Sequence, residues 1–185
     1  MSSSPVSKNP RSARDRILAS AEAVAREAGP ANLSLDAVAA HAGVSKGGLL
    51  YHFPNKASLL AAMVEGFLAD LDRRLQEQEK ARGGGPDCVL QAYLDIFLEE
   101  QRSKRPPPSG ILAAMAESPE FLEPVRRYER LFLDRIRANA SDPVRATITF
   151  LALHGIRCME LISSPVVSDD EIETAIARMR LAAGA

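Results

Sequence analysis

The sequence has little that would point to a secreted, metal-binding or membrane protein. Its two cysteines, Cys88 and Cys158, form neither a disulfide framework nor a metal-ligand spacing, and none of its three histidines has a second His or Cys at such a spacing. No apolar run approaches the ~20 residues of a membrane span, and the polar N-terminus lacks the apolar segment of a secretory signal. We therefore expect a reduced, cytoplasmic protein without membrane contact.

Motifs of catalysis are missing as well. The chain has no G-x-S-x-G nucleophile elbow, no phosphate-binding loop and no dinucleotide fingerprint. A single helical thiol such as Cys88 is more often inert packing than a redox centre. The sequence therefore predicts a protein that is not an enzyme and that needs no cofactor.

Signals for β-strands are scarce too. β-Branched residues are sparse, apolar and polar residues do not alternate, and no Asn-Gly or Asp-Gly turn occurs. With 185 residues, 46% of them hydrophobic and 25% charged, the chain is long enough for a sizeable core. We predict an all-α fold of about nine helices, at residues 12–28, 35–42, 45–53, 55–82, 89–98, 111–117, 119–136, 143–163 and 168–181.

Local start and stop signals set the first boundaries. Ser12, Ser34, Ser45 and Asn55 occupy N-cap positions, where a side-chain oxygen accepts a hydrogen bond from a free backbone N–H. Gly43 ends the second helix in the left-handed conformation that glycine tolerates, and Pro54 ends the third because its ring cannot continue a helix. The run RGGGP then separates the long fourth helix from the rest of the chain.

The charge of the chain is unevenly distributed. The whole carries a net charge of −1, but residues 1–56 hold seven Lys and Arg against four Asp and Glu, so the remainder is acidic. An asymmetry of this kind is typical of chains with a basic segment for nucleic acid, although chance scatter alone would explain an excess this small.

Two short helices separated by the turn AGVS form a helix-turn-helix pattern at residues 35–53. The second helix carries Gly47 and Gly48 in its first turn, although each costs a helix roughly 1 kcal/mol relative to alanine. Leu49 and Phe53 are the apolar positions expected to hold this helix to the core. Glycines at a helix start permit close approach of its backbone to DNA, where the free amides of the first turn can meet a phosphate.

This arrangement resembles the TetR family of transcriptional regulators. The resemblance is carried by the stretches ILASAEAVAREAG and LSLDAVAAHAGVSKGGLLYHFPNKASLL, followed by an all-helical remainder. It implies an N-terminal three-helix DNA-binding domain and a larger helical domain that binds a ligand and forms a homodimer through the last two helices. We accordingly expect a flexible arm at 1–11, a DNA-binding domain at 12–56 and a ligand-binding and dimerisation domain at 57–185.

The resemblance also implies which residues meet the operator, a double-stranded DNA site. In the family, positions matching the recognition helix and the start of the next helix commonly contact phosphates. One departure is Gly48, where many relatives carry a residue that touches a base. Base readout therefore falls more on Lys46, on neighbours such as Ser45, and on the helix at 35–42 or the N-terminal arm. Ordinary solvated side chains are the alternative for each basic residue. The predicted DNA-binding residues are Ser45, Lys46, Gly47, Gly48, Tyr51, His52, Lys56 and Arg14.

A pocket for an unidentified small-molecule effector is a further expectation from the resemblance. Any one of its candidate residues could equally be plain core, and the side chains of Arg157 and Glu160 could face a pocket, a partner or solvent. The candidates are Phe97, Met115, Phe121, Tyr128, Phe132, His154 and Arg157.

The sequence thus predicts a ligand-responsive, DNA-binding transcriptional regulator, a repressor that binds an inverted-repeat operator as a dimer. The alternative is a helical ligand-binding protein or small enzyme that kept this architecture without a DNA function. The glycine-containing, charged third helix argues against that alternative. A third option is an activator or a ligand-free regulator.

Overall fold

We describe a computed structural model of the chain, which defines residues 12–29, 32–103, 123–161 and 166–182. Within these ranges the chain forms eight α-helices and no strand, which confirms the predicted all-α fold. The helix expected at 111–117 and the predicted arm at 1–11 lie outside the described residues. In the described part, no helix is both long and apolar enough to cross a membrane.

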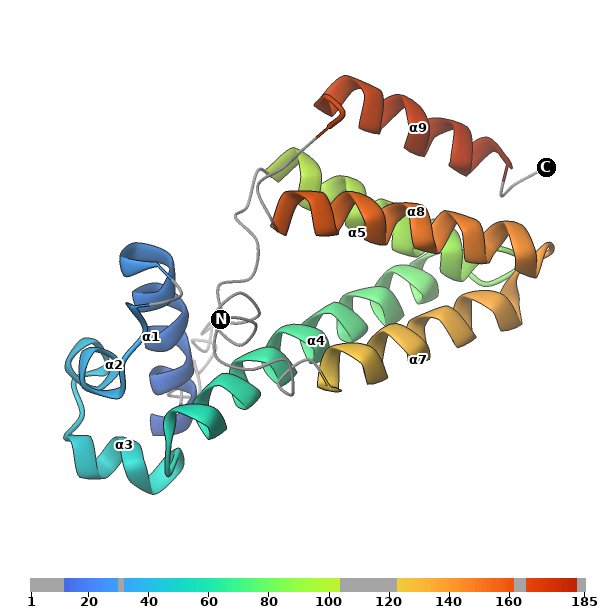
Figure 1. The fold of residues 1–185 in the computed structure, drawn as a ribbon. Coiled ribbons are helices and arrows are strands. Elements are labelled where there is room, and N and C mark those ends of the chain that lie inside the picture. The colour runs from blue at the N-terminus through green and yellow to red at the C-terminus, as the bar shows by residue number, and fades with distance from the viewer. Residues whose placement is uncertain (1–11, 30–31, 104–122, 162–165, 183–185) are drawn as a thin grey trace, which may run out of the picture.

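The first three helices form a small bundle at one end of the molecule (Figure 1). Helices α1 (Ala13–Ala28), α2 (Leu35–Ala42) and α3 (Lys46–His52) begin at the N-caps predicted from the sequence. Their apolar faces meet in one cluster, which the first turns of α4 complete. The buried side chains of this cluster include Ile17, Ala21, Leu33, Val38, Ala39, Leu49, Phe53, Leu59, Leu60 and Met63.

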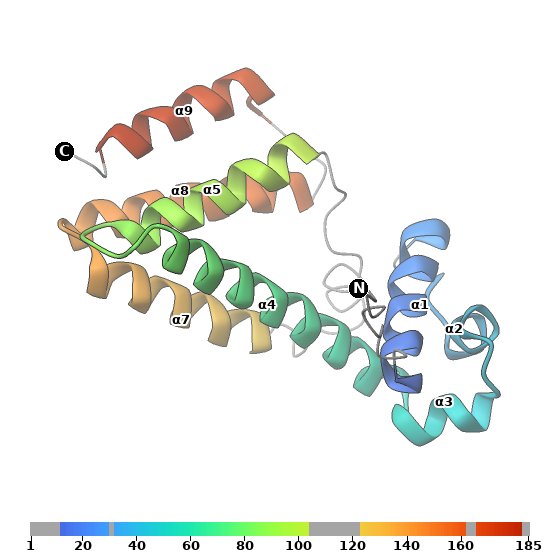
Figure 2. The ribbon, with the colours of Figure 1, turned by 180° about the vertical axis from the view of Figure 1, so that it is seen from behind.

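Helix α4 (Lys56–Ala81) connects this bundle to the rest of the chain. Its 26 residues span roughly 39 Å, and Figures 1 and 2 show it running from beside α1 and α3 into the C-terminal helices. The capping box of Asn55 with Ser58 fixes its start, because each side chain accepts a hydrogen bond from the other residue's backbone N–H. One rigid element is therefore shared by both ends of the molecule.

The C-terminal helices pack around α5 (Cys88–Ser103), which is buried along most of its length. Helices α7 (Glu123–Asn139) and α8 (Pro143–Leu161) pack against each other and α7 also packs against α4, while α9 (Asp169–Ala182) lies over α5. Half-buried ion pairs supplement the apolar contacts, such as Arg135 of α7 with Asp72 and Glu79 of α4, both at 2.6 Å. The second core includes Leu75, Tyr93, Leu94, Phe97, Phe132, Ile136, Phe150, Leu153 and Ile176.

A polar junction built on the buried Asp87 joins the start of α5 to the turn between α7 and α8. Asp87 has a positive φ of 61° and is almost fully buried. Its carboxylate accepts hydrogen bonds from the backbone N–H and the hydroxyl of Ser141, and its own N–H donates to the carbonyl of Asn139 at 3.0 Å. Buried polar groups need such partners, so this junction fixes the relative position of three helices.

Candidate nucleic-acid interface and effector site

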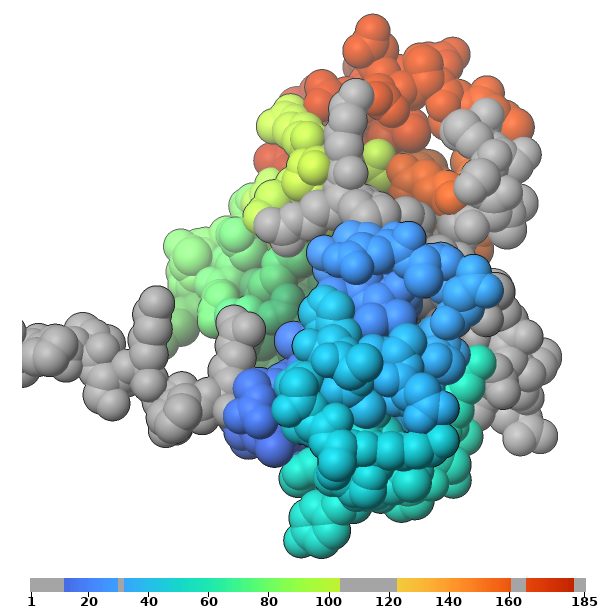
Figure 3. All heavy atoms as spheres, turned by 90° about the vertical axis from the view of Figure 1, so that its left-hand side faces the viewer, coloured from blue at the N-terminus to red at the C-terminus, as the bar shows by residue number. Residues whose placement is uncertain are grey.

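Helix α3 has one buried side and one open side. Leu49 and Phe53 are buried in the N-terminal core, as the sequence predicts. Ser45, Lys46, Gly47 and Tyr51 are exposed, and Tyr51 is 85% exposed despite its size. Figure 3 shows this side of the molecule, with α2 and α3 open at its surface. A large exposed aromatic beside small and basic residues suits contact with a partner better than packing.

The turn before α3 sets the angle between α2 and α3. Gly43 adopts φ 65° and ψ 36°, the left-handed conformation, and its N–H donates to carbonyls at the end of α2. The N–H of Val44 also donates to the carbonyl of Ala39 at 3.1 Å. Ser45 then caps α3, its hydroxyl accepting from the N–H of Gly48 at 3.0 Å. These bonds confirm the predicted helix-turn-helix and present the first turn of α3 outward.

The two glycines of α3 differ in the space around them. A Cβ on Gly47 would lie 4.0 Å from the Ser45 hydroxyl, which is an ordinary contact. A Cβ on Gly48 would lie 3.3 Å from the same oxygen and 3.9 Å from the Val44 side chain, which is tighter. Gly47 therefore has no packing reason within the described residues to be glycine, which leaves its outward approach as the explanation to test.

Lys46 forms an ion pair with Asp36, a residue that is distant from it in the sequence. Its ammonium is 3.0 Å from one oxygen of Asp36 and 3.1 Å from the other. Asp36 belongs to the first turn of α2, so the ion pair spans the helix-turn-helix. Sequence reasoning missed this contact because the two residues are ten positions apart and only the turn brings them together.

The other predicted DNA residues flank α3. The guanidinium of Arg14 lies over the Phe53 ring at 5.2 Å, which places the start of α1 beside the end of α3. The half-buried His52 ring meets the Tyr51 ring edge to face at 5.1 Å. Lys56 is the first residue of α4 and is half-buried. The fold therefore gathers all eight predicted residues around α3, and their DNA contacts stay a prediction.

An aromatic cluster occupies the centre of the C-terminal helices. Tyr93 stands between the rings of Phe132 at 6.2 Å, Phe150 at 5.6 Å and His154 at 6.5 Å. Tyr128 extends the cluster through Phe132 at 5.9 Å. Burial raises the pKa of the Tyr93 hydroxyl, which keeps it neutral. Tyr93 and Phe150 were missed from sequence, since helical spacing alone does not separate them from other core positions.

Arg157 is the cation of this cluster. Its guanidinium lies over the rings of Tyr93 at 5.5 Å and Phe97 at 5.2 Å, donates to the Tyr93 hydroxyl at 3.0 Å and pairs with Glu100 at 2.8 Å. Burial acts to lower the pKa of Arg157, but its interactions with Tyr93 and Glu100 outweigh burial and raise it. The other oxygen of Glu100 accepts from Arg74 of α4 at 2.9 Å. Arg157 thus faces the interior.

His154 and Glu160 of α8 both have polar partners on neighbouring helices. His154 has one ring nitrogen 3.0 Å from the Phe150 carbonyl and the other 3.2 Å from the Glu129 carboxylate. Glu160 accepts a hydrogen bond from Gln101 at 2.6 Å. The structure therefore brings together Phe97, Tyr128, Phe132, His154 and Arg157, whereas Met115 and Phe121 lie outside the described residues. A ligand-binding role for this group stays a prediction.

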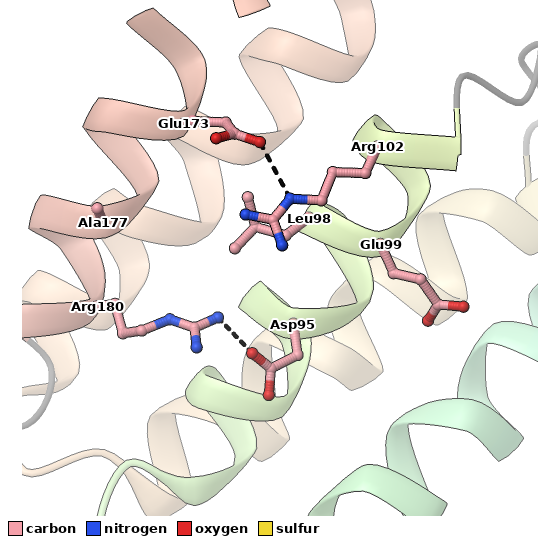
Figure 4. A pocket seen from close by; sticks show the side chains of 7 residues that line it. All are labelled: Asp95, Leu98, Glu99, Arg102, Glu173, Ala177 and Arg180. Atoms are coloured by element: carbon pink, nitrogen blue, oxygen red, sulfur yellow. Dashed lines mark hydrogen bonds and ion pairs between the residues drawn. The ribbon is translucent and has the colours of Figure 1, made fainter. Parts of the chain in front are cut away.

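A separate groove of about 520 Å³ lies between α5 and α9 (Figure 4). Arg102 pairs with Glu173 at 3.0 Å across it, and Arg180 pairs with Asp95. The remaining carboxylate, Glu99, pairs with Arg74, so the lining favours no class of charged ligand. Its lining residues are Asp95, Leu98, Glu99, Arg102, Glu173, Ala177 and Arg180. No cluster suited to a metal ion occurs within the described residues.

Helix α8 exposes an apolar stripe. Val144, Ile148 and Leu151 are 70%, 62% and 60% exposed, and the exposed Gly155 and Cys158 continue the line. Their spacing alternates between four and three residues, which is the repeat of a helix that packs against a partner helix.

A helix-turn-helix presented by a three-helix bundle, joined by one long helix to a larger helical domain, defines a class of DNA-binding regulators. Comparison with known families agrees. Residues 17–63 match the description "Bacterial regulatory proteins, tetR family", and residues 87–183 match "Tetracyclin repressor-like, C-terminal domain". The chain belongs to the tetR family of regulators, and its function is DNA binding and transcription regulation rather than catalysis.

Solved structures support the fold. The multidrug binding protein EbrR complexed with malachite green is 22% identical, with a TM-score of 0.68 over 90% of this chain and 96% of that chain. The SmeT–triclosan complex is 22% identical, with a TM-score of 0.68 over 92% and 90%. EbrR complexed with ethidium is 22% identical, with a TM-score of 0.59 over 92% and 99%. No curated protein matches the chain in sequence.

Proposed function

We propose that this regulator is a ligand-responsive repressor that binds an inverted-repeat operator as a homodimer. The observation that supports DNA binding is the open side of α3. There the two glycines, a lysine and an 85% exposed tyrosine lie together on a helix whose other side is buried in the core. In this proposal α3 enters the major groove, with Lys46 and Ser45 nearest the bases. Tyr51, His52, Lys56 and Arg14 meet the flanking phosphates, and the protein acts in the cytoplasm, where bacterial DNA lies.

Selection of bound DNA from a random duplex library tests this proposal. The expected result is an inverted repeat, with half-sites separated by about one or more helical turns because each subunit presents one recognition helix. Recovery of a single half-site would contradict the dimeric mode. Failure to enrich any sequence would favour the alternative of a ligand-binding protein without DNA function.

The exposed stripe of α8 supports the homodimer. A water-exposed line of Val144, Ile148 and Leu151 is costly unless a partner covers it, and two copies of α8 and α9 would bury it in a four-helix contact. Sedimentation equilibrium at micromolar concentration should give a dimer, and Leu151→Glu should shift the protein to monomers. Thr174→Glu, on the exposed part of α9, tests whether that helix takes part. A wild-type monomer would exclude this assembly.

The aromatic cluster supports an effector of largely apolar, aromatic character. The Arg157 guanidinium lies over the rings of Tyr93 and Phe97, and the His154 imidazole lies against those of Tyr93 and Phe150. Such a combination of rings and a few polar groups can stack on an aromatic ligand and orient it. The structurally similar EbrR and SmeT were solved with malachite green, ethidium and triclosan, which makes these compounds suitable first probes.

Effector binding would act on DNA through α4. Glu100 bridges Arg157 of the cluster and Arg74 of α4, so a ligand that displaces Arg157 changes the contacts of the helix that leads to the DNA-binding bundle. The ligand favours the state with low operator affinity only by its differential contacts with the two states. A probe should therefore raise the melting temperature and release the operator. Compounds that stabilise the protein without releasing DNA would refute the repressor mechanism.

A further inference from the structure

The ion pair between Asp36 and Lys46 contributes little to the stability of the fold. Both side chains are largely exposed, at 59% for Lys46 and 70% for Asp36, and exposed pairs contribute only about 0–1 kcal/mol to stability. Nevertheless the ammonium is held by both carboxylate oxygens, at 3.0 and 3.1 Å. The pair joins the first turns of α2 and α3, at the side of the helix-turn-helix that faces away from the core.

We propose that Asp36 is a positioning residue that determines DNA specificity by holding Lys46 toward the base edges of the operator. The inference rests on the proposed docking of α3 in the major groove. A lysine ammonium has three N–H donors. Asp36 takes those that point toward α2, which leaves a donor for a base acceptor such as the O6 or N7 of guanine.

The same carboxylate reduces attraction to DNA in general. An unpaired lysine on a flexible four-carbon stem would reach any nearby phosphate, whatever the sequence. Paired with Asp36, the lysine has almost no net charge to offer a backbone phosphate. The pair therefore persists on the operator, where Lys46 reads a base, and prevents a strong contact on random DNA.

Removing the carboxylate separates these effects. In Asp36→Asn the lysine becomes free to add one phosphate contact on a random duplex, which steepens the plot of log binding constant against log salt by about 0.9. Between 1 M and 0.1 M salt that slope corresponds to a gain of roughly eightfold in affinity for random DNA. Operator affinity stays the same or falls, because the Lys46 side chain is no longer held toward the bases. The operator-to-random ratio should therefore fall by at least fivefold.

The experiment measures binding of the full chain to the selected operator and to a random duplex of equal length, across a salt series. Glu27→Gln is the matched control, since it removes one exposed acid at the far end of α1, roughly 20 Å along the helix from Arg14. It should leave the ratio unchanged. Asp36→Glu keeps the charge but moves it, so it should preserve the slope on random DNA and weaken only operator binding.

A double-mutant cycle shows whether Asp36 acts through Lys46. In a Lys46→Met background, Asp36→Asn should no longer change the operator-to-random ratio. Three results would overturn the inference. The operator-to-random ratio could be unchanged by Asp36→Asn in the wild-type background, or it could fall equally in the Lys46→Met background. It could also fall in the control variant Glu27→Gln. Absence of DNA binding by the wild-type chain would instead refute the proposed function. Melting curves of each variant report folding, and Asp36→Glu keeps the test decisive should Asp36→Asn unfold.

Discussion

Replacement of Gly47 by alanine separates the stability of α3 from its approach to DNA. Gly47 follows Lys46 in the first turn of α3, and its surroundings accept a methyl group, since the nearest atom would be the Ser45 hydroxyl at 4.0 Å. If packing alone mattered, alanine would be the better residue at this position. The glycine then remains to be explained by what approaches from outside.

The expected gain in stability follows from helix propensity. Alanine in place of glycine in a helix gains about 0.5–1 kcal/mol, because glycine loses more backbone freedom on folding. For a protein of this size, 1 kcal/mol corresponds to a shift of roughly 2–4 °C in melting temperature. We expect Gly47→Ala to melt about 1–4 °C higher than the wild type, and to bind its operator at least roughly tenfold more weakly, a loss of about 1.4 kcal/mol.

Differential scanning calorimetry and fluorescence anisotropy with labelled operator measure the two quantities. Gly66→Ala is the matched control, because Gly66 is an exposed helical glycine of α4 whose Cβ would meet no atom within 4 Å. It should gain similar stability without losing DNA affinity. A Gly47→Ala protein that is more stable and binds the operator as tightly as the wild type would refute the idea that this glycine lets the backbone approach DNA.

Three further predictions concern single side chains. Tyr51→Ala should leave the melting temperature unchanged, because the ring is 85% exposed, and should weaken operator binding in anisotropy titrations; equal binding would exclude a DNA contact. Burial raises the pKa of Glu22, so its ionised form opposes folding as the pH rises above 4.5. Glu22→Gln should therefore melt at a higher temperature than the wild type at pH 7. This difference in melting temperature should disappear below about pH 4, where the carboxyl is protonated in both the folded and the unfolded state. Asp87→Ala should cost about 1–3 kcal/mol in urea unfolding, since it removes the acceptor of two part-buried hydrogen bonds from Ser141, whereas a neutral result would show that water replaces it.

The boundaries of the first three helices could be predicted from the sequence because short-range signals set them. The N-caps at Ser12, Ser34 and Ser45, the left-handed Gly43 and the break at Pro54 are short-range signals, and each helix begins or ends where they predict. Such signals act between residues one to four positions apart, so no tertiary information is needed to interpret them. The same reasoning predicted that Leu49 and Phe53 are core residues, because positions four residues apart lie on the same face of a helix.

Tertiary structure decided everything that depends on contacts between distant residues. No spacing in the sequence pairs Lys46 with Asp36, seats Arg157 between Tyr93 and Phe97, or joins Glu100 to α4. The direction of the Arg157 side chain was open from the sequence, since a helix of apolar character on nearly every side does not show which side its neighbours cover. Helix propensity and capping are properties of adjacent residues, whereas ion pairs and aromatic contacts depend on how whole helices pack. The sequence therefore determined the class of regulator and its recognition helix, and the packing of α4, α5, α7 and α8 decided where its charges meet.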